Sequence, residues 1–342
     1  MHSGCHPVSF GATILDADGL ALTADEAAFF RDADPFGFIL FARNIDNPEQ
    51  VRALCDQMRE AVGRAAPITI DQEGGRVQRI VPPMARQWTA PLDFVAAAGE
   101  EGERGMYLRY LLIAAELRDL GIDSNCAPMA DIAFAETHAF LRNRCYGTEP
   151  ATIAKLARAG AQGHLDGGVL PVIKHIPGHG RATQDSHFEL PRIDAPLADL
   201  QAADFAVFRA LNDLPLGMTA HIRLMDVDDS APATLSGPVM NLIREDIGFE
   251  GLIMTDDIGM KALSGSLSDI TTRALEAGCD VILHCNAPLS ERQEVAAAAG
   301  RMSTAAQARA VAALARRKTP DDIDISALSA ELEMLLGGQV HG

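Results

Sequence analysis

Short apolar runs recur along the chain, and amphipathic or alanine-rich segments separate them. Each run is apolar nearly throughout, which is typical of strands that are covered on both faces of a parallel sheet. We predict eight strands, at residues 11–15, 37–41, 67–70, 122–127, 170–174, 216–220, 252–255 and 281–284. Helical patterns lie between most of them, at residues 48–63, 105–120, 151–163, 197–211, 236–247 and 268–277.

Strands that alternate with helices indicate a parallel sheet, and eight such units indicate a closed barrel. The alternative is an open doubly wound sheet, which usually carries a glycine-rich phosphate turn after its first strand. The sequence after Leu15 is DADGL, which lacks that fingerprint. We therefore predict an α/β fold made of a single (β/α)₈ TIM-type barrel, with irregularity expected at the first strands and extra helices at the C-terminus.

The domain organisation follows from the absence of a linker rich in proline, glycine or serine. We expect residues 1–342 to form one catalytic domain, with a barrel core at about 8–287 and C-terminal helices within 288–337. Helical patterns at 290–317 and 325–336 account for that last part, and we expect them to pack on the outside of the barrel.

Polar side chains stand where the predicted strands end. They are Asp71 after the third strand, Asp131 just past the fourth, Lys174 and His175 at the fifth, His221 at the sixth and Asp256 at the seventh. A single aspartate in such a place is as often a helix cap or a strand-end ion pair as a functional group. Barrel active sites, however, are built where the carboxyl ends of the strands converge, so this set predicts a site.

A long loop follows the fifth strand. It begins with KHIPGHG at residues 174–180 and reaches DSH at 185–187. The imidazole of His187 exchanges a proton near neutral pH, and Asp185 can fix its tautomer and stabilise its charged form. The alternative is a surface histidine paired with Asp185.

Two carboxylates, Asp256 and Asp257, end the seventh strand. Successive strand residues point to opposite faces, so one can face the pocket while the other caps a following helix. We expect Asp257 to cap a helix that starts near Ile258, which leaves Asp256 as the slightly better candidate for a nucleophile. A carboxylate can attack an anomeric carbon and form a glycosyl-enzyme that water then hydrolyses.

Basic residues near the strand ends fit an uncharged sugar. Arg79, Arg144 and Lys174 can donate to hydroxyl groups together with a carboxylate such as Asp71. The alternative is a solvated salt bridge, which we favour for Arg144 taken alone.

Five histidines also raise the possibility of a metal centre, namely His175, His179, His187, His221 and His284. The first strand has no HxH pair and the chain has no HExxH helix, so we expect no metal centre.

The charge and composition of the chain make some classes of partner unfavourable. The formal net charge is −18 and the pI is about 4.9, so nucleic acid and anionic membrane surfaces are unfavourable partners. The N-terminus lacks the basic and apolar regions of a signal peptide, and no stretch approaches a membrane span. Six scattered cysteines without a CxxC pair indicate reduced thiols. We expect a cytoplasmic monomer, and the net charge says nothing about whether it binds an uncharged sugar.

Five motifs in order resemble glycoside hydrolase family 3, and within it the bacterial cytoplasmic β-N-acetylglucosaminidases of peptidoglycan recycling. They are GFILFARN (37–44), IDQEGGRVQR (70–79), KHIPGHG (174–180), DSH (185–187) and TDD (255–257). The likeness extends from about residue 10 to 284, and KHIPGHG with a downstream DSH is its most specific element. A Cys-Tyr pair at 145–146 stands where the family more often has Ser-Phe, and we expect no second domain, so the barrel supplies its own acid/base.

The resemblance implies roles for individual residues. Asp256 matches the family's nucleophile, His187 its acid/base, and Asp185 the partner of that histidine. Residues that match the binding site for non-reducing N-acetylglucosamine are Asp71, Arg79, Arg144, Lys174 and His175. The implied substrate is N-acetylglucosaminyl-1,6-anhydro-N-acetylmuramic acid with or without its peptide, hydrolysed with retention and without a cofactor. The alternatives are a phosphorylase or β-glucosidase of the same family, and a sugar-binding protein that has lost catalysis.

Overall fold

Eight parallel strands form the centre of the molecule. The computed structural model describes residues 9–184, 189–320 and 323–337. The strands are β1 Gly11–Leu15, β2 Pro35–Leu40, β3 Ile68–Ile70, β6 Ser124–Asn125, β7 Leu170–Ile176, β9 Leu216–Thr219, β11 Leu252–Met254 and β12 Ile282–His284. Their order is β11-β9-β7-β6-β3-β2-β1-β12, and a bridge between Met254 and Val281 joins the two edges. The predicted closed (β/α)₈ barrel is confirmed. The register shifts between β1 and β2, where irregularity was expected, and also between β7 and β9.

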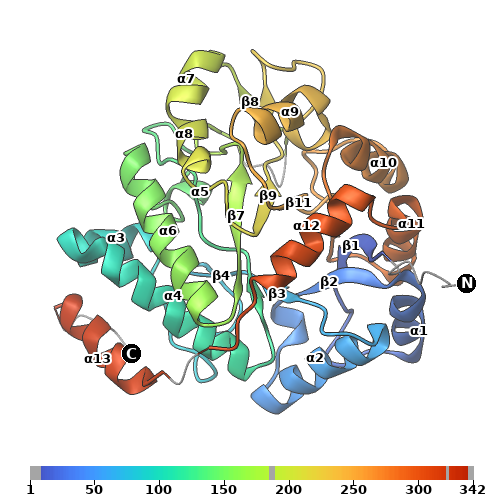
Figure 1. Cartoon of the computed structure of the whole chain (residues 1–342), viewed down its shortest axis with the longest axis horizontal. Coiled ribbons are helices and arrows are strands. Elements are labelled where there is room, and N and C mark those ends of the chain that lie inside the picture. Colours follow the sequence, from blue (N-terminus) through green and yellow to red (C-terminus); the bar gives the residue numbers. More distant parts are fainter. Residues whose placement is uncertain (1–8, 185–188, 321–322, 338–342) are drawn as a thin grey trace, which may run out of the picture.

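Helices surround this barrel, as Figure 1 shows. They are α1 Ala24–Ala33, α2 Pro48–Val62, α4 Gly102–Asp119, α6 Pro150–Asp166, the pair α7 Leu197–Ala202 and α8 Asp204–Arg209, α9 Gly237–Glu245, α10 Leu267–Ala277 and α11 Leu289–Ala299. Smaller elements lie in the connections: η1 Ala42–Asn44, β4 Gln72–Gly74, β5 Val77–Gln78, α3 Pro91–Ala98, η2 Gly99–Glu101, α5 Ala139–Arg142, β8 Arg192–Ile193, β10 Arg223–Leu224 and η3 Ala233–Leu235. Among the described residues, no helix is both long enough and apolar enough to cross a membrane.

Local signals set the ends of α2. The Asn47 side chain accepts from the backbone N–H of Gln50, and Pro48 stands at the first helical position, where its missing N–H costs nothing. The helix ends at Gly63, whose φ of 64° is left-handed and unfavourable for a residue with a Cβ. These signals explain why the predicted range 48–63 agrees with the structure to within one residue.

Two predicted helices are each divided in the structure. Residues 197–211 break at Ala203 into α7 and α8, and the carboxylate of Asp204 binds the side chain of Arg181. Residues 290–317 break after α11 at Gly300, which has a φ of 59°, and Ser303 then caps α12 Thr304–Ala315. A single run of periodic apolar residues does not reveal such breaks, because the pattern continues across them.

The C-terminal helices do more than pack on the outside of the barrel. Helix α11 contacts α10, α1 and β1 and is the eighth barrel helix, so barrel elements extend past residue 287. Helix α12 crosses the amino ends of the strands, at the centre of Figure 1, where Arg309 pairs with Asp280 and the adjoining Arg317 pairs with Asp123. Only α13 Ile325–Leu335 lies outside, against α4. The amino end of the barrel is therefore covered, which leaves the carboxyl end for a ligand.

Candidate active site

A cavity of about 440 Å³ opens at the carboxyl ends of the strands. That volume suits a small ligand. The predicted site residues Asp71, Arg79, Arg144, Lys174, His175 and Asp256 all line it. Asp185 and His187 lie outside the described residues. The structure thus brings together six of the eight residues that we expected to form a site.

Asp71 follows β3 and binds two cations. Its Oδ2 lies 2.9 Å from a terminal nitrogen of Arg79, and its Oδ1 lies 3.1 Å from Nζ of Lys174. Burial by itself would raise the pKa of Asp71, but Lys174 and Arg79 outweigh that effect and hold the pKa well below its usual range. Asp71 is therefore an ionised acceptor, suited to bind sugar hydroxyls.

Arg144 and Lys174 share a buried carboxylate, that of Glu73. The guanidinium of Arg144 donates to both Glu73 oxygens, at 2.9 and 2.8 Å, and Nζ of Lys174 lies 2.5 Å from Oε1. Burial by itself would raise the pKa of Glu73, but Arg144 and Lys174 outweigh that effect and lower the pKa to about 2. The solvated salt bridge that we favoured for Arg144 alone is wrong, because the arginine is only 7% exposed.

His175 is fixed by Asp131. Its Nδ1 lies 2.8 Å from Oδ2 of Asp131, and the backbone N–H groups of His175 and His179 also donate to this carboxylate, at 3.2 and 2.6 Å. Since a carboxylate only accepts, Nδ1 carries the proton and Nε2 is the nitrogen left to accept from a ligand. Burial, reinforced by Arg144, lowers the pKa of His175 to about 3, so the imidazole is neutral at pH 7.

Asp256 and Asp257 both line the cavity, half-buried, in the turn after β11. The helix expected to start near Ile258 is absent: residues 258–263 form turns, and α10 begins only at Leu267. The Asp257 carboxylate instead accepts from the backbone N–H of Gly259 at 3.0 Å. The side chain of Asp257 therefore stabilises a turn rather than capping a helix. The backbone N–H of Asp257 donates to Oδ1 of Asp256 at 2.8 Å.

The family model described as the glycosyl hydrolase family 3 N-terminal domain matches residues 15–317. The chain belongs to glycosyl hydrolase family 3. A β-hexosaminidase of Alkalilimnicola ehrlichii is 36% identical over 286 residues, 81% of each chain. One of Methylococcus capsulatus is 34% identical over 324 residues, 94% of this chain and 95% of the relative. The chain is therefore a glycosidase.

Solved structures of the family agree with the fold. Native NagZ from Neisseria gonorrhoeae is 28% identical, with a TM-score of 0.84 over 98% of this chain and 99% of that one. NagZ from the same organism in complex with N-trifluoroacetyl-D-glucosamine is also 28% identical, with a TM-score of 0.83 over 97% of each chain.

Several residues that line the cavity of this family 3 barrel were not predicted. Arg43 lies in η1 after β2, Asn286 lies just after β12, and both bind the carboxylate of Asp16. Their position after predicted strands was the available signal. Glu73 was also missed, although it lies within the motif that contains Asp71.

Three more of the five histidines lie within the described residues, and His187 lies outside them. His179, His221 and His284 are buried but do not line the cavity. Within residues 9–184, 189–320 and 323–337, no group of three or more His, Cys, Asp or Glu side chains is arranged to hold a metal ion.

We expect the ion pairs of Glu73 with Arg144 and Lys174 to make the stability of this family 3 barrel depend on pH. The pKa of Glu73 is lowered from 4.5 to about 2, so its contribution is complete above about pH 4.5 and is lost as the pH falls through 2. Glu73→Gln should cost on the order of 3 kcal/mol at pH 7, and the difference from wild type should shrink between pH 4.5 and 2. Urea unfolding at pH 7, 4 and 2.5 measures this. A constant difference at all three values would contradict it.

Proposed function

We propose that the chain is a retaining β-N-acetylhexosaminidase that releases non-reducing terminal β-linked N-acetylglucosamine. The observation that carries this proposal is one cavity that holds the Asp71–Arg79–Lys174 group together with the carboxylate of Asp256. A cluster of fixed donors and acceptors suits a sugar ring, and a nearby carboxylate suits its anomeric carbon. Relatives named β-hexosaminidase support the same activity.

Hydrogen-bond acceptors and donors of the cavity together hold the sugar in this proposal. The ionised Asp71 accepts from hydroxyl groups, and the cations Arg79, Lys174 and Arg144 donate to hydroxyl and acetamide oxygens. Neutral His175 accepts through Nε2, because Asp131 occupies Nδ1. The NagZ complex with an N-acylated glucosamine supports a sugar of this type. Pairing with Glu73 orients Arg144 and Lys174 before the ligand arrives, which reduces the entropy lost on binding.

Asp256 acts as the nucleophile in this mechanism. Its carboxylate forms a bond to the anomeric carbon while the glycosidic oxygen leaves and takes a proton from His187, which Asp185 orients. His187 then removes a proton from water, whose oxygen displaces Asp256 and releases the sugar with its original β-configuration. Two inversions at one carbon give retention.

The expected substrates are cell-wall fragments, N-acetylglucosaminyl-1,6-anhydro-N-acetylmuramic acid with or without its peptide. We propose that the protein is a cytoplasmic monomer that hydrolyses them without a cofactor. We also propose that it binds neither nucleic acid nor membranes.

A stereochemical assay tests the proposal. NMR of p-nitrophenyl N-acetyl-β-D-glucosaminide turnover should show the β-anomer of N-acetylglucosamine first, with the α-anomer appearing only by mutarotation. The same assay in about 50 mM phosphate, an ionic strength near the physiological one, should proceed at the same rate as without phosphate. Initial α-product would exclude the covalent route. Strong acceleration with formation of a sugar phosphate would instead identify a phosphorylase.

A further inference from the structure

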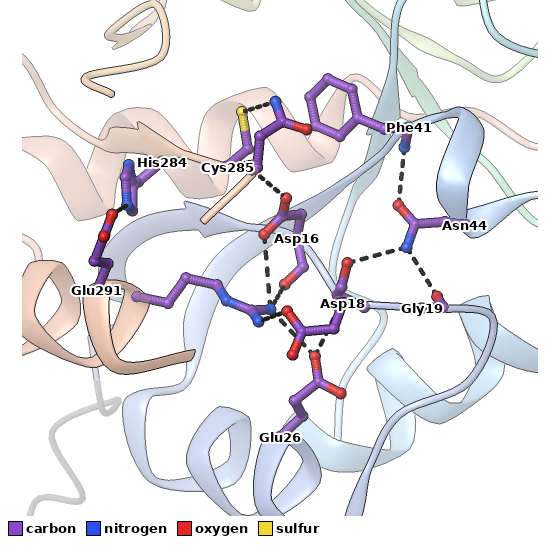
Figure 2. Close-up of polar contacts among 12 residues, drawn as sticks. Asp16, Asp18, Gly19, Glu26, Phe41, Asn44, His284, Cys285 and Glu291 are labelled. Carbon is purple, nitrogen blue, oxygen red and sulfur yellow. Dashed lines mark hydrogen bonds and ion pairs between the residues drawn. The ribbon is translucent and has the colours of Figure 1, made fainter. Parts of the chain in front are cut away.

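His284, at the end of β12, is a buried imidazole that faces a carboxylate on each side. Its Nδ1 lies 3.5 Å from Oδ1 of Asp257, and its Nε2 lies 3.8 Å from Oε2 of Glu291. The side chains of His284 and Glu291 point toward each other in Figure 2. The histidine is 1% exposed, and neither ring nitrogen meets hydrogen-bond geometry with another described residue. Burial of a polar side chain without a hydrogen-bond partner costs folding free energy, so this histidine calls for an explanation.

The chemistry of the contacts decides which form of the ring fits. An ionised carboxylate only accepts, so a ring nitrogen that faces one must carry a proton for the contact to be attractive. The nitrogen that faces the carboxylate of Asp257 is Nδ1. Burial by itself would raise the pKa of Asp257, but its contacts with His284 and the Gly259 N–H hold the pKa below its usual range, so its carboxylate is an acceptor for a proton on Nδ1.

Asp257 in turn fixes the backbone that carries Asp256. Its carboxylate accepts from the N–H groups of Gly259 and Cys285, at 3.0 and 3.4 Å, and its carbonyl oxygen lies 3.0 Å from Nε2 of His221. The N–H of Asp257 donates to Oδ1 of Asp256 at 2.8 Å. A shift of the Asp257 side chain would therefore move the N–H that orients the Asp256 carboxylate.

We propose that His284 is a positioning residue for the reaction: through Nδ1 and the carboxylate of Asp257, it holds Asp256 in the orientation for attack on the anomeric carbon. Glu291 lies on the other side of the ring, 3.8 Å from Nε2. This inference rests on the proposed function, because it requires Asp256 to be the nucleophile.

Three substitutions at one position test the proposal. Asparagine places an amide N–H near the position of Nδ1, facing Asp257, whereas glutamine places one near Nε2, facing Glu291. His284→Asn should keep kcat within about threefold of wild type. His284→Gln and His284→Leu should lower kcat by about 10- to 100-fold, with KM within about threefold, because a misplaced reacting group slows chemistry more than binding. The substrate is p-nitrophenyl N-acetyl-β-D-glucosaminide, and assays run at least about 15 °C below each variant's Tm.

Glutamine is the matched control, because it is buried, polar and neutral like asparagine but directs its donor to the other carboxylate. Trapping with a 5-fluoro-N-acetylglucosaminyl fluoride, followed by intact mass, reports attack by the nucleophile directly. The rate of labelling should fall in the Gln and Leu variants and recover in Asn. Equal losses in Asn and Gln, or wild-type kcat in Leu, would overturn the proposal.

The design separates two failures. If Asp256→Ala abolishes activity and labelling while all three His284 variants behave as wild type, only the positioning role is wrong. If Asp256→Ala stays active, the proposed nucleophile itself is wrong.

Discussion

Asp256→Ala should lower kcat for p-nitrophenyl N-acetyl-β-D-glucosaminide by at least about 10⁴-fold. The physical reason is that the variant has no carboxylate to form the glycosyl-enzyme, so the two-step route is closed. KM should change far less, because the groups that we propose to hold the sugar, such as Asp71 and Lys174, are untouched. Steady-state kinetics measures both quantities. Added azide should restore turnover and give the α-glycosyl azide, since a small nucleophile can occupy the vacated space and attack once.

The control for this substitution is Asp32→Ala, which removes an exposed carboxylate from the outer face of α1. It should leave kcat and KM unchanged. More than about 1% of wild-type activity in Asp256→Ala, without azide, would move the nucleophile assignment to the neighbouring Asp257, which also lines the cavity.

Lys174→Met should destabilise the fold by about 3 kcal/mol and abolish measurable substrate binding. The lysine side chain is 2% exposed and lies within 3.1 Å of Asp71 and 2.5 Å of Glu73. Methionine fills a similar volume but removes the cation, so two desolvated carboxylates face each other with one fewer positive charge between them. Burial lowers the pKa of Lys174, but Glu73 and Asp71 outweigh it and raise the pKa above its ordinary value, which keeps the lysine charged at pH 7.

Urea unfolding and isothermal titration with N-acetylglucosamine measure the two effects. The control is Lys318→Met, because Lys318 lies 3.7 Å from Asp166 but is 63% exposed. Solvent screens that surface pair, so its loss should change stability by less than about 0.5 kcal/mol. Equal effects in the two variants would mean that the network around Glu73 contributes no more than a surface ion pair.

Prediction from the sequence succeeded where the signal is local. The predicted runs located all eight barrel strands, and most of these strands are apolar because both of their faces are buried. The shortest is β6, Ser124–Asn125, within a predicted run of 122–127. Helix breaks at Ala203 and Gly300 were missed, since apolar periodicity continues through them.

The same distinction applies to the site. Position at the end of a predicted strand identified Asp71, Lys174, His175 and Asp256, and the barrel then placed all four around one cavity, although β7 continues to Ile176. The expected pairing of Asp257 with a helix failed because the following residues form turns before α10. The roles of Asp185 and His187 remain predictions that rest on the resemblance, since both lie outside the described residues.

By itself, the sequence determined the barrel, the rim of strand ends and the polar side chains that stand on it. These depend on periodicity and order along the chain, which are local properties. Only the tertiary structure decided which side chains pair: Glu73 with Arg144, 71 positions apart, Asp131 with His175, and His284 with Asp257. Such partners meet because the barrel closes, and their charges and burial exist only once it has closed.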